Sequence, residues 1–202
     1  MGDEAEARAI ASAKAGDREV LGQLFARWRP RLERLVDLRL DARLRGRLDP
    51  QDVLQEAWLD IGRRYDDWVK DPAMPLFLWV RFLVVQKLAE QHRRNGAQQR
   101  DAWREVPMHA GPSASNESLA ERLAGHMSSP SQGLKREELA AGVQAALAAL
   151  DELDREVLVL RHFEELGNGE VAQVLGITPA GASNRYVRAL KRLRVALEGG
   201  SA

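Results

Sequence analysis

The sequence contains no cysteine among its 202 residues, so neither a disulfide nor a thiolate metal site can form. It also lacks any apolar run near the roughly 18 residues of a membrane span. The first six residues include Asp3, Glu4 and Glu6, which makes this start acidic and unlike a signal peptide. We therefore expect a cytoplasmic protein without membrane insertion.

The net charge is zero, because 30 Lys and Arg balance 30 Asp and Glu. This balance argues against a uniformly basic nucleic-acid binder, but binding depends on where the charges lie. Residues 27–47 carry eight Arg against three acids, and residues 179–197 carry five cations and no acid. The charge that matters for binding is therefore expected to be local.

Groups that could carry catalysis are scarce. The four histidines are scattered without the spacing of metal ligands: His92, His109, His126 and His162. The pair Asp66 and Asp67 has no third acidic partner nearby, so a solvated turn explains it better than a cation site. The turn at residues 167–169 lacks the Gly-Lys-Ser/Thr ending of a phosphate loop. The sequence predicts no enzyme, no cofactor and no metal.

Apolar residues recur at helical spacing through most of the chain. One stripe lies in residues 20–28, another in residues 53–61, and residues 76–88 have the pattern of a buried helix. Runs of β-branched residues bounded by turn signals are missing, so no segment indicates a strand. We expect an all-α fold.

A change of composition divides the chain. Residues 105–133 are rich in Pro, Gly and Ser, a mixture that does not sustain a packed core. All five tryptophans precede this stretch. We therefore expect two small helical domains, residues 1–104 and 135–202, joined by a flexible linker at residues 105–134.

Residues 170–197 predict a helix, a tight turn and a second helix. Gly176 would end the first helix, Thr178 would cap the second, and Pro179 would preset its first turn. A helix-turn-helix of this kind places its second helix in the major groove of DNA. The acid-free run supports this interpretation, because ordinary solvated faces mix both signs of charge. A plain helical hairpin with a basic face is the alternative.

A second helix start lies at Asp49 and Pro50, which supply a cap and a first helical residue. The apolar stripe of this helix leaves a mixed outer face: Gln55, Glu56, Leu59 and Arg63. Such a face suits docking on another protein, although by itself it also fits a plain surface helix.

Residues 49–59 resemble the helix with which bacterial sigma factors grip the clamp of core RNA polymerase, and Asp52, Gln55 and Glu56 match its Asp-x-x-Gln-Glu pattern. Residues 77–94 look like the next helix of that family, which captures the melted promoter element. Residues 147–158 resemble the lead-in to the second domain, and the helix-turn-helix follows. The order of motifs and the two-domain length resemble the extracytoplasmic-function (ECF) group.

The resemblance implies a region-two-like helical bundle and a region-four-like helix-turn-helix domain. The implied function is transcription initiation, with core RNA polymerase and promoter DNA as partners and an anti-sigma factor as a further candidate partner. Three sets of residues carry these roles: Asp52, Gln55, Glu56, Leu59 and Arg63 for polymerase; Trp68, Trp79, Arg81, Arg93 and Arg94 for the single-stranded downstream element; Thr178, Ser183, Asn184, Arg185, Arg188, Lys191 and Arg192 for the duplex upstream element.

Some residues depart from the family pattern. Ala180, Gly181 and Ala182 stand where Gly-Thr-Val is usual, and Gln86-Lys87 stands where an Arg-Asn pair is common, so the promoter sequence does not follow from the resemblance.

Three alternatives stay open. Trp68 and Trp79 also fit core positions, since aromatic residues at helical spacing usually pack inside. A stand-alone helix-turn-helix regulator would explain residues 170–197, but it does not explain the helix that carries Asp52, Gln55 and Glu56. A helical adaptor without a DNA role leaves the acid-free run unexplained.

Overall fold

Helices form all the regular structure in the part of the chain that the computed structural model describes, residues 2–41, 44–94, 114, 119–120 and 133–199. Within those ranges no strand occurs, which confirms the prediction of an all-α fold. The helices run in the order α1 (Gly2–Lys14), α2 (Arg18–Arg39), α3 (Pro50–Lys70), α4 (Leu76–Arg94), α6 (Gly133–Ala148), α7 (Glu152–His162), α8 (Asn168–Leu175) and α9 (Pro179–Gly199).

The helix boundaries follow local capping chemistry. Asp49 Oδ1 accepts a hydrogen bond from the backbone N–H of Gln51 over 2.8 Å, and Pro50 is the first residue of α3. Gly176 ends α8 with a φ of 64°, a left-handed conformation that glycine adopts without a Cβ penalty. Thr178 Oγ1 then accepts the N–H of Gly181 over 3.0 Å. These three predicted caps are confirmed.

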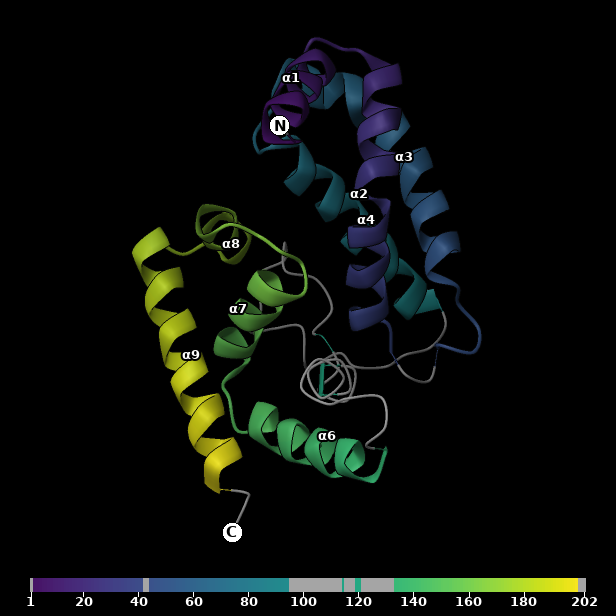
Figure 1. Ribbon diagram of the computed structural model, residues 1–202. Coiled ribbons are helices and arrows are strands. Elements are labelled where there is room, and N and C mark those ends of the chain that lie inside the picture. The colour runs from purple at the N-terminus through teal and green to yellow at the C-terminus, as the bar shows by residue number, and fades with distance from the viewer. Residues whose placement is uncertain (1, 42–43, 95–113, 115–118, 121–132, 200–202) are drawn as a thin grey trace.

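The first half, α1 to α4, is a helical bundle in which α1 packs on α2 and α3 packs on α4 (Figure 1). Its core holds large apolar side chains, among them Trp28, Leu32, Ile61 and Val84. Tyr65 is buried with them and donates its hydroxyl to the carbonyl of Ala13, which ties α3 to the end of α1. The outer face of α3 is thereby held in a fixed orientation.

The second half, α6 to α9, is organised around α9, on which α6, α7 and α8 all pack. Val143 and Leu147 of α6 are buried with Leu158 of α7 and Ala189 of α9. Figure 1 shows α9 along one side of this half, with α7 between α9 and the first half. The helix-turn-helix, α8 and α9, thus has one face open to the outside.

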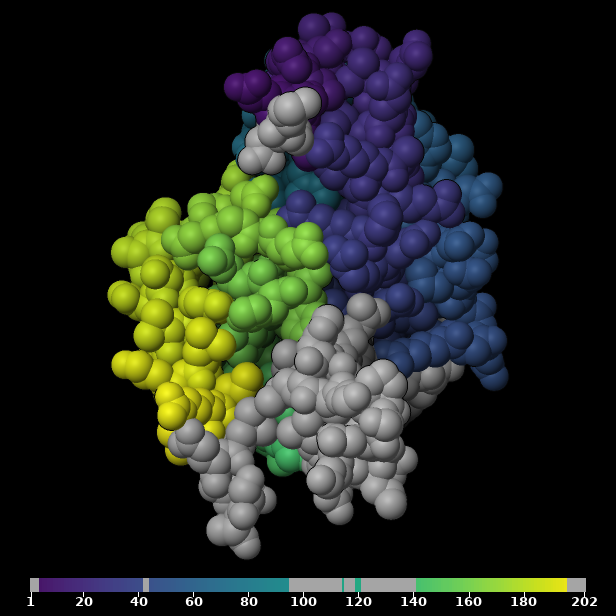
Figure 2. Space-filling model, viewed as in Figure 1, coloured from purple at the N-terminus to yellow at the C-terminus, as the bar shows by residue number. Residues whose placement is uncertain are grey.

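The two halves touch in this structure. Val157, Leu160 and Leu166 belong to the same buried apolar cluster as Leu35 and Phe77 of the first half. Figure 2 shows the second half (green to yellow) lying against the first half (purple to blue). The predicted linker, residues 105–134, lies almost wholly outside the described residues, so its flexibility and the domain boundaries stay predictions.

Among the described residues, none of the helices combines the length and the apolar character that crossing a bilayer requires.

Candidate protein and nucleic-acid interfaces

The outer face of α3 carries the residues predicted to bind polymerase. Leu59 is 54% exposed, and the nearby Gln55 is exposed too, whereas Arg63 lies one turn further along the same face. Glu56 is half-buried, and its Oε1 accepts a hydrogen bond from Gln91 Nε2 of α4 over 2.8 Å. The helix therefore presents one exposed apolar side chain among polar groups, an arrangement that is compatible with the centre and rim of a small protein-binding surface. Asp52 is exposed near the helix start.

Two tryptophans predicted to touch melted DNA lie inside the first half. Trp68 and Trp79 are only 4% and 8% exposed, and their rings stack with centroids 5.5 Å apart. Trp68 also donates its Nε1–H to the carbonyl of Met74 over 3.2 Å. Of the two interpretations that the sequence left open, this arrangement favours a core role. Both rings brace the connection between α3 and α4.

The predicted cations of α4 are divided between surface and interior. Arg93 and Arg94 are exposed at the end of the helix, and Arg94 pairs with Glu90 over 2.6 Å. Arg81 is only 1% exposed, and its Nε donates to Glu164 Oε2 over 2.6 Å. In this arrangement Arg81 is closed off from any ligand, whereas the other two cations are accessible.

Glu164 is the centre of a buried charge cluster between the halves. Its carboxylate accepts hydrogen bonds from Arg81 of α4 and from Arg39 of α2, whose Nε lies 2.9 Å from Oε1. Arg39 also pairs with the buried Glu156 of α7. Burial alone would raise the pKa of Glu164, but the two guanidinium groups lower it to about 2. Burial raises the pKa of Glu156, and Arg39 only partly opposes that effect.

Sequence reasoning did not identify this cluster. Its members come from α2, α4, α7 and the turn after α7, and no local period links them. The available signal was the run of arginines in residues 27–47, which supplies Arg39.

The recognition helix α9 exposes part of the face that was predicted to read DNA. Ser183, Asn184 and Lys191 are exposed, and so is Thr178 just before the helix. Val187 is 47% exposed, although the sequence analysis did not single it out. Apolar side chains on a recognition helix can contact the methyl group of thymine, so Val187 belongs with the candidate readers.

Three further predicted DNA contacts are arginines that pair with carboxylates of α7 and its cap. Arg188 binds Asp154 through two hydrogen bonds of 2.8 and 2.7 Å, and Arg185 adds a third of 3.0 Å. Arg192 reaches both Asp151 and Asp154 over 3.3 Å. Burial opposes ionisation of Asp154, but hydrogen bonds from Arg188 and Arg185 hold its pKa below the ordinary value. These arginines fix the orientation of α9, and their charge is partly neutralised.

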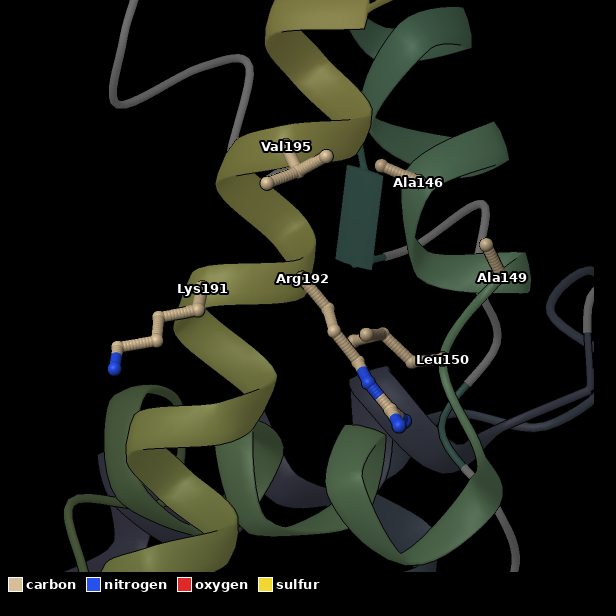
Figure 3. Close-up of a pocket in the computed structure, with 6 residues that line it drawn as sticks. All are labelled: Ala146, Ala149, Leu150, Lys191, Arg192 and Val195. Atoms are coloured by element: carbon tan, nitrogen blue, oxygen red, sulfur yellow. The ribbon is translucent and has the colours of Figure 1, made fainter.

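A groove of about 370 Å³ lies between α6 and α9 (Figure 3). Figure 3 shows Arg192 extending along it toward Leu150, whereas Lys191 points away. Val195, at 68% exposure, forms part of its apolar wall. Two predicted DNA contacts are thus separated, since Lys191 points outward and Arg192 turns toward α6 and α7.

Within the described ranges, no three His, Asp or Glu side chains gather closely enough to hold a metal ion.

Comparisons with known proteins agree with this architecture. Residues 141–193 match the family model for region 4 of sigma-70. The chain is 26% identical over 201 residues to the RNA polymerase sigma factor CnrH of Cupriavidus metallidurans, covering 98% of this chain and 97% of that one. It is 28% identical over 185 residues to the ECF RNA polymerase sigma factor SigD of Mycobacterium tuberculosis, covering 92% and 80%.

The fold is also similar to a solved structure of CnrH in complex with the cytosolic domain of CnrY. The TM-score is 0.54 at 24% identity, with 95% of this chain and 96% of that chain covered. The matches to whole proteins extend along nearly the whole chain, and most of the helix-turn-helix lies in the part that matches region 4. The chain is thus similar, over nearly its whole length, to bacterial RNA polymerase sigma factors that include members of the ECF group.

Proposed function

We propose that this chain initiates transcription by binding core RNA polymerase and directing it to specific promoters. The main support is that two kinds of surface occur in one chain. The outer face of α3 exposes Leu59 among polar groups, and the helix-turn-helix exposes the face of α9 that carries the candidate DNA-reading residues. The names of the relatives SigD and CnrH support polymerase as the partner. The role is one of binding and positioning, not of catalysis.

The division of labour follows the two halves. Residues 1–104 dock on polymerase and hold the melted downstream element, residues 105–134 set the reach between the halves, and residues 135–202 bind the upstream element. Asn184 suits adenine through paired hydrogen bonds, and Lys191 suits phosphate as a point charge. Arg93 and Arg94 are placed to follow a single strand by its phosphates.

A protein inhibitor is a further candidate partner. The neighbour CnrH has been solved with the cytosolic domain of CnrY, and a partner of that kind would act on this chain by occupying surfaces that polymerase needs.

The test is transcription from a randomised promoter library by core RNA polymerase, with and without the protein. We expect promoter-specific transcripts only when the protein is present. The double variant Gln55→Ala plus Glu56→Ala should lose most of them. Its matched control is Glu19→Ala plus Gln23→Ala, a change of the same residue types at exposed positions of α2, which should keep them.

A second outcome would decide against this proposal. Absence of transcripts together with tight binding of duplex DNA by the protein alone would overturn polymerase docking and favour a stand-alone regulator.

A further inference from the structure

Four fully buried charged side chains lie across the boundary between the halves. Arg39 and Arg81 come from the first half, and Glu156 and Glu164 come from the second. Two positive and two negative charges balance within the cluster. The ion pairs that carry this balance cross from one half to the other, so the cluster exists only while the halves are closed on each other.

Two arginines of α2 also contact the turn that carries Glu164, on the outer side of the buried cluster. Arg31 of α2 donates from Nη2 to the carbonyl of Glu165 over 2.9 Å, and its guanidinium lies 3.9 Å from the ring centroid of Phe77. Arg34 pairs with the Glu165 carboxylate over 2.9 Å. Glu165 has a φ of 54°, a left-handed conformation that a side chain other than glycine adopts only under constraint. The surrounding contacts supply that constraint.

The apolar contact beside this cluster is incompletely filled. A pocket of about 220 Å³ that is partly open to solvent lies between α4 and α8, lined by Leu78, Arg81 and Phe82 on one side and by Gln173 and Val174 on the other. Buried ion pairs also add little net stability, because removing the charges from water costs about as much as their attraction returns. Both features favour a boundary that specifies one geometry and can open.

We propose that the turn bearing Glu164 is an intramolecular latch that holds the two halves of the free protein closed. Closure buries Arg81 and sets α8 against α4, so this one cation of the predicted promoter-binding set is covered by the domain that reads the other element, whereas Arg93 and Arg94 stay exposed. Polymerase and promoter bind the open form and shift the population toward it. This consequence rests on the proposed function, whereas the latch itself is a property of the chain alone.

The absence of native cysteine makes the latch directly measurable. The changes Asp67→Cys on α3 and Gln144→Cys on α6 place one dye on an exposed site of each half of the full chain. Single-molecule energy transfer then gives the open fraction without polymerase or DNA. In the parent protein we expect one dominant closed population.

Glu164→Gln keeps the shape of the side chain and removes its charge, and we expect the open fraction to rise at least fivefold. Arg31→Ala removes a contact on the outer side of the cluster without touching the buried charges, and it should raise the open fraction at least twofold. Arg29→Ala is the control, because this exposed arginine on the same helix pairs with Glu33 of its own helix. It should leave the distribution unchanged.

Circular dichroism reports whether each variant keeps its helices. If Glu164→Gln fails to fold, Arg31→Ala decides the question. The latch is overturned if the parent shows no dominant closed population, or if the folded variants keep the parent distribution. Transcription assays are scored separately, so loss of promoter activity would count against the proposed function and not against the latch.

Discussion

Arg188 of α9 and Asp154 of α7 form a bidentate ion pair, with Nε to Oδ2 at 2.8 Å and Nη2 to Oδ1 at 2.7 Å. The Asp154 side chain is fully buried, whereas Arg188 is half-exposed. The backbone N–H of Asp154 is itself bound by Asp151 Oδ1 over 2.8 Å. The cap of α7 and the orientation of the recognition helix therefore depend on the same pair of carboxylates.

Replacing Asp154 with Asn should destabilise the protein by about 1 to 3 kcal/mol, because three arginines lose a charged acceptor. Chemical denaturation followed by circular dichroism measures the loss. Arg192→Ala removes a more exposed contact of 3.3 Å from the same cluster and should cost less than about 1 kcal/mol. Equal losses from the two variants would contradict a central role for Asp154.

The exposed side chains of α9 should separate base reading from phosphate binding. Asn184→Ala should lower discrimination between the best promoter and its single-base variants by about 1 to 3 kcal/mol. Lys191→Ala should weaken all sequences alike and reduce the salt slope of binding by about one. Competition binding of the polymerase complex at several salt concentrations measures both effects. If Asn184→Ala weakened binding to all sequences equally, Asn184 would not be a residue that reads a base.

Local chemistry explains what the sequence could predict. Asp49, Gly176 and Thr178 act on neighbouring backbone groups, so the helix boundaries they set are visible in the sequence. The exposure of Leu59 likewise follows from the periodicity of α3. All of these rest on contacts a few residues apart.

The parts that could not be predicted depend on contacts between distant segments. Arg81 meets Glu164 across 83 positions of the chain, and Arg39 meets it across 125. The acid-free run in residues 179–197 indicated a basic face, but Asp151 and Asp154 approach that face in space. Charge counted along a sequence cannot show which opposite charge the fold brings near.

Leu59 should anchor the docking face of α3. Leu59→Asp places a charge in the centre of a protein interface, and we expect affinity for core RNA polymerase to fall at least tenfold, which corresponds to about 1.4 kcal/mol. Folding stability should be unchanged, because the side chain is exposed. Asp67→Asn, at an exposed position further along α3, is the control. Unaltered affinity of the Leu59 variant would place the docking surface elsewhere.

His162 should make the stability of the second half depend on pH. Burial lowers its pKa and the charge of Arg161 lowers it further, while its Nε2 lies 3.0 Å from the hydroxyl of Tyr186. The unfolded chain therefore binds more protons, so stability rises with pH and is lost as pH falls below about 6.5. Urea midpoints at pH 7.5 and 5.5 should differ more for the parent than for His162→Gln. Equal differences would contradict this assignment.

Two glycines of the helix-turn-helix should respond in opposite directions to the same substitution. Gly176→Ala puts a Cβ into a left-handed conformation at the end of α8 and should cost about 1 to 2 kcal/mol. Gly169 lies within α8, and no atom lies within 4 Å of the place that an alanine methyl would take, so Gly169→Ala should preserve stability or raise it by up to about 1 kcal/mol. Thermal unfolding of the two variants tests the pair. Unchanged stability of Gly176→Ala would mean that the turn is not set by the conformation of Gly176, and a clear loss for Gly169→Ala would contradict the prediction for that position.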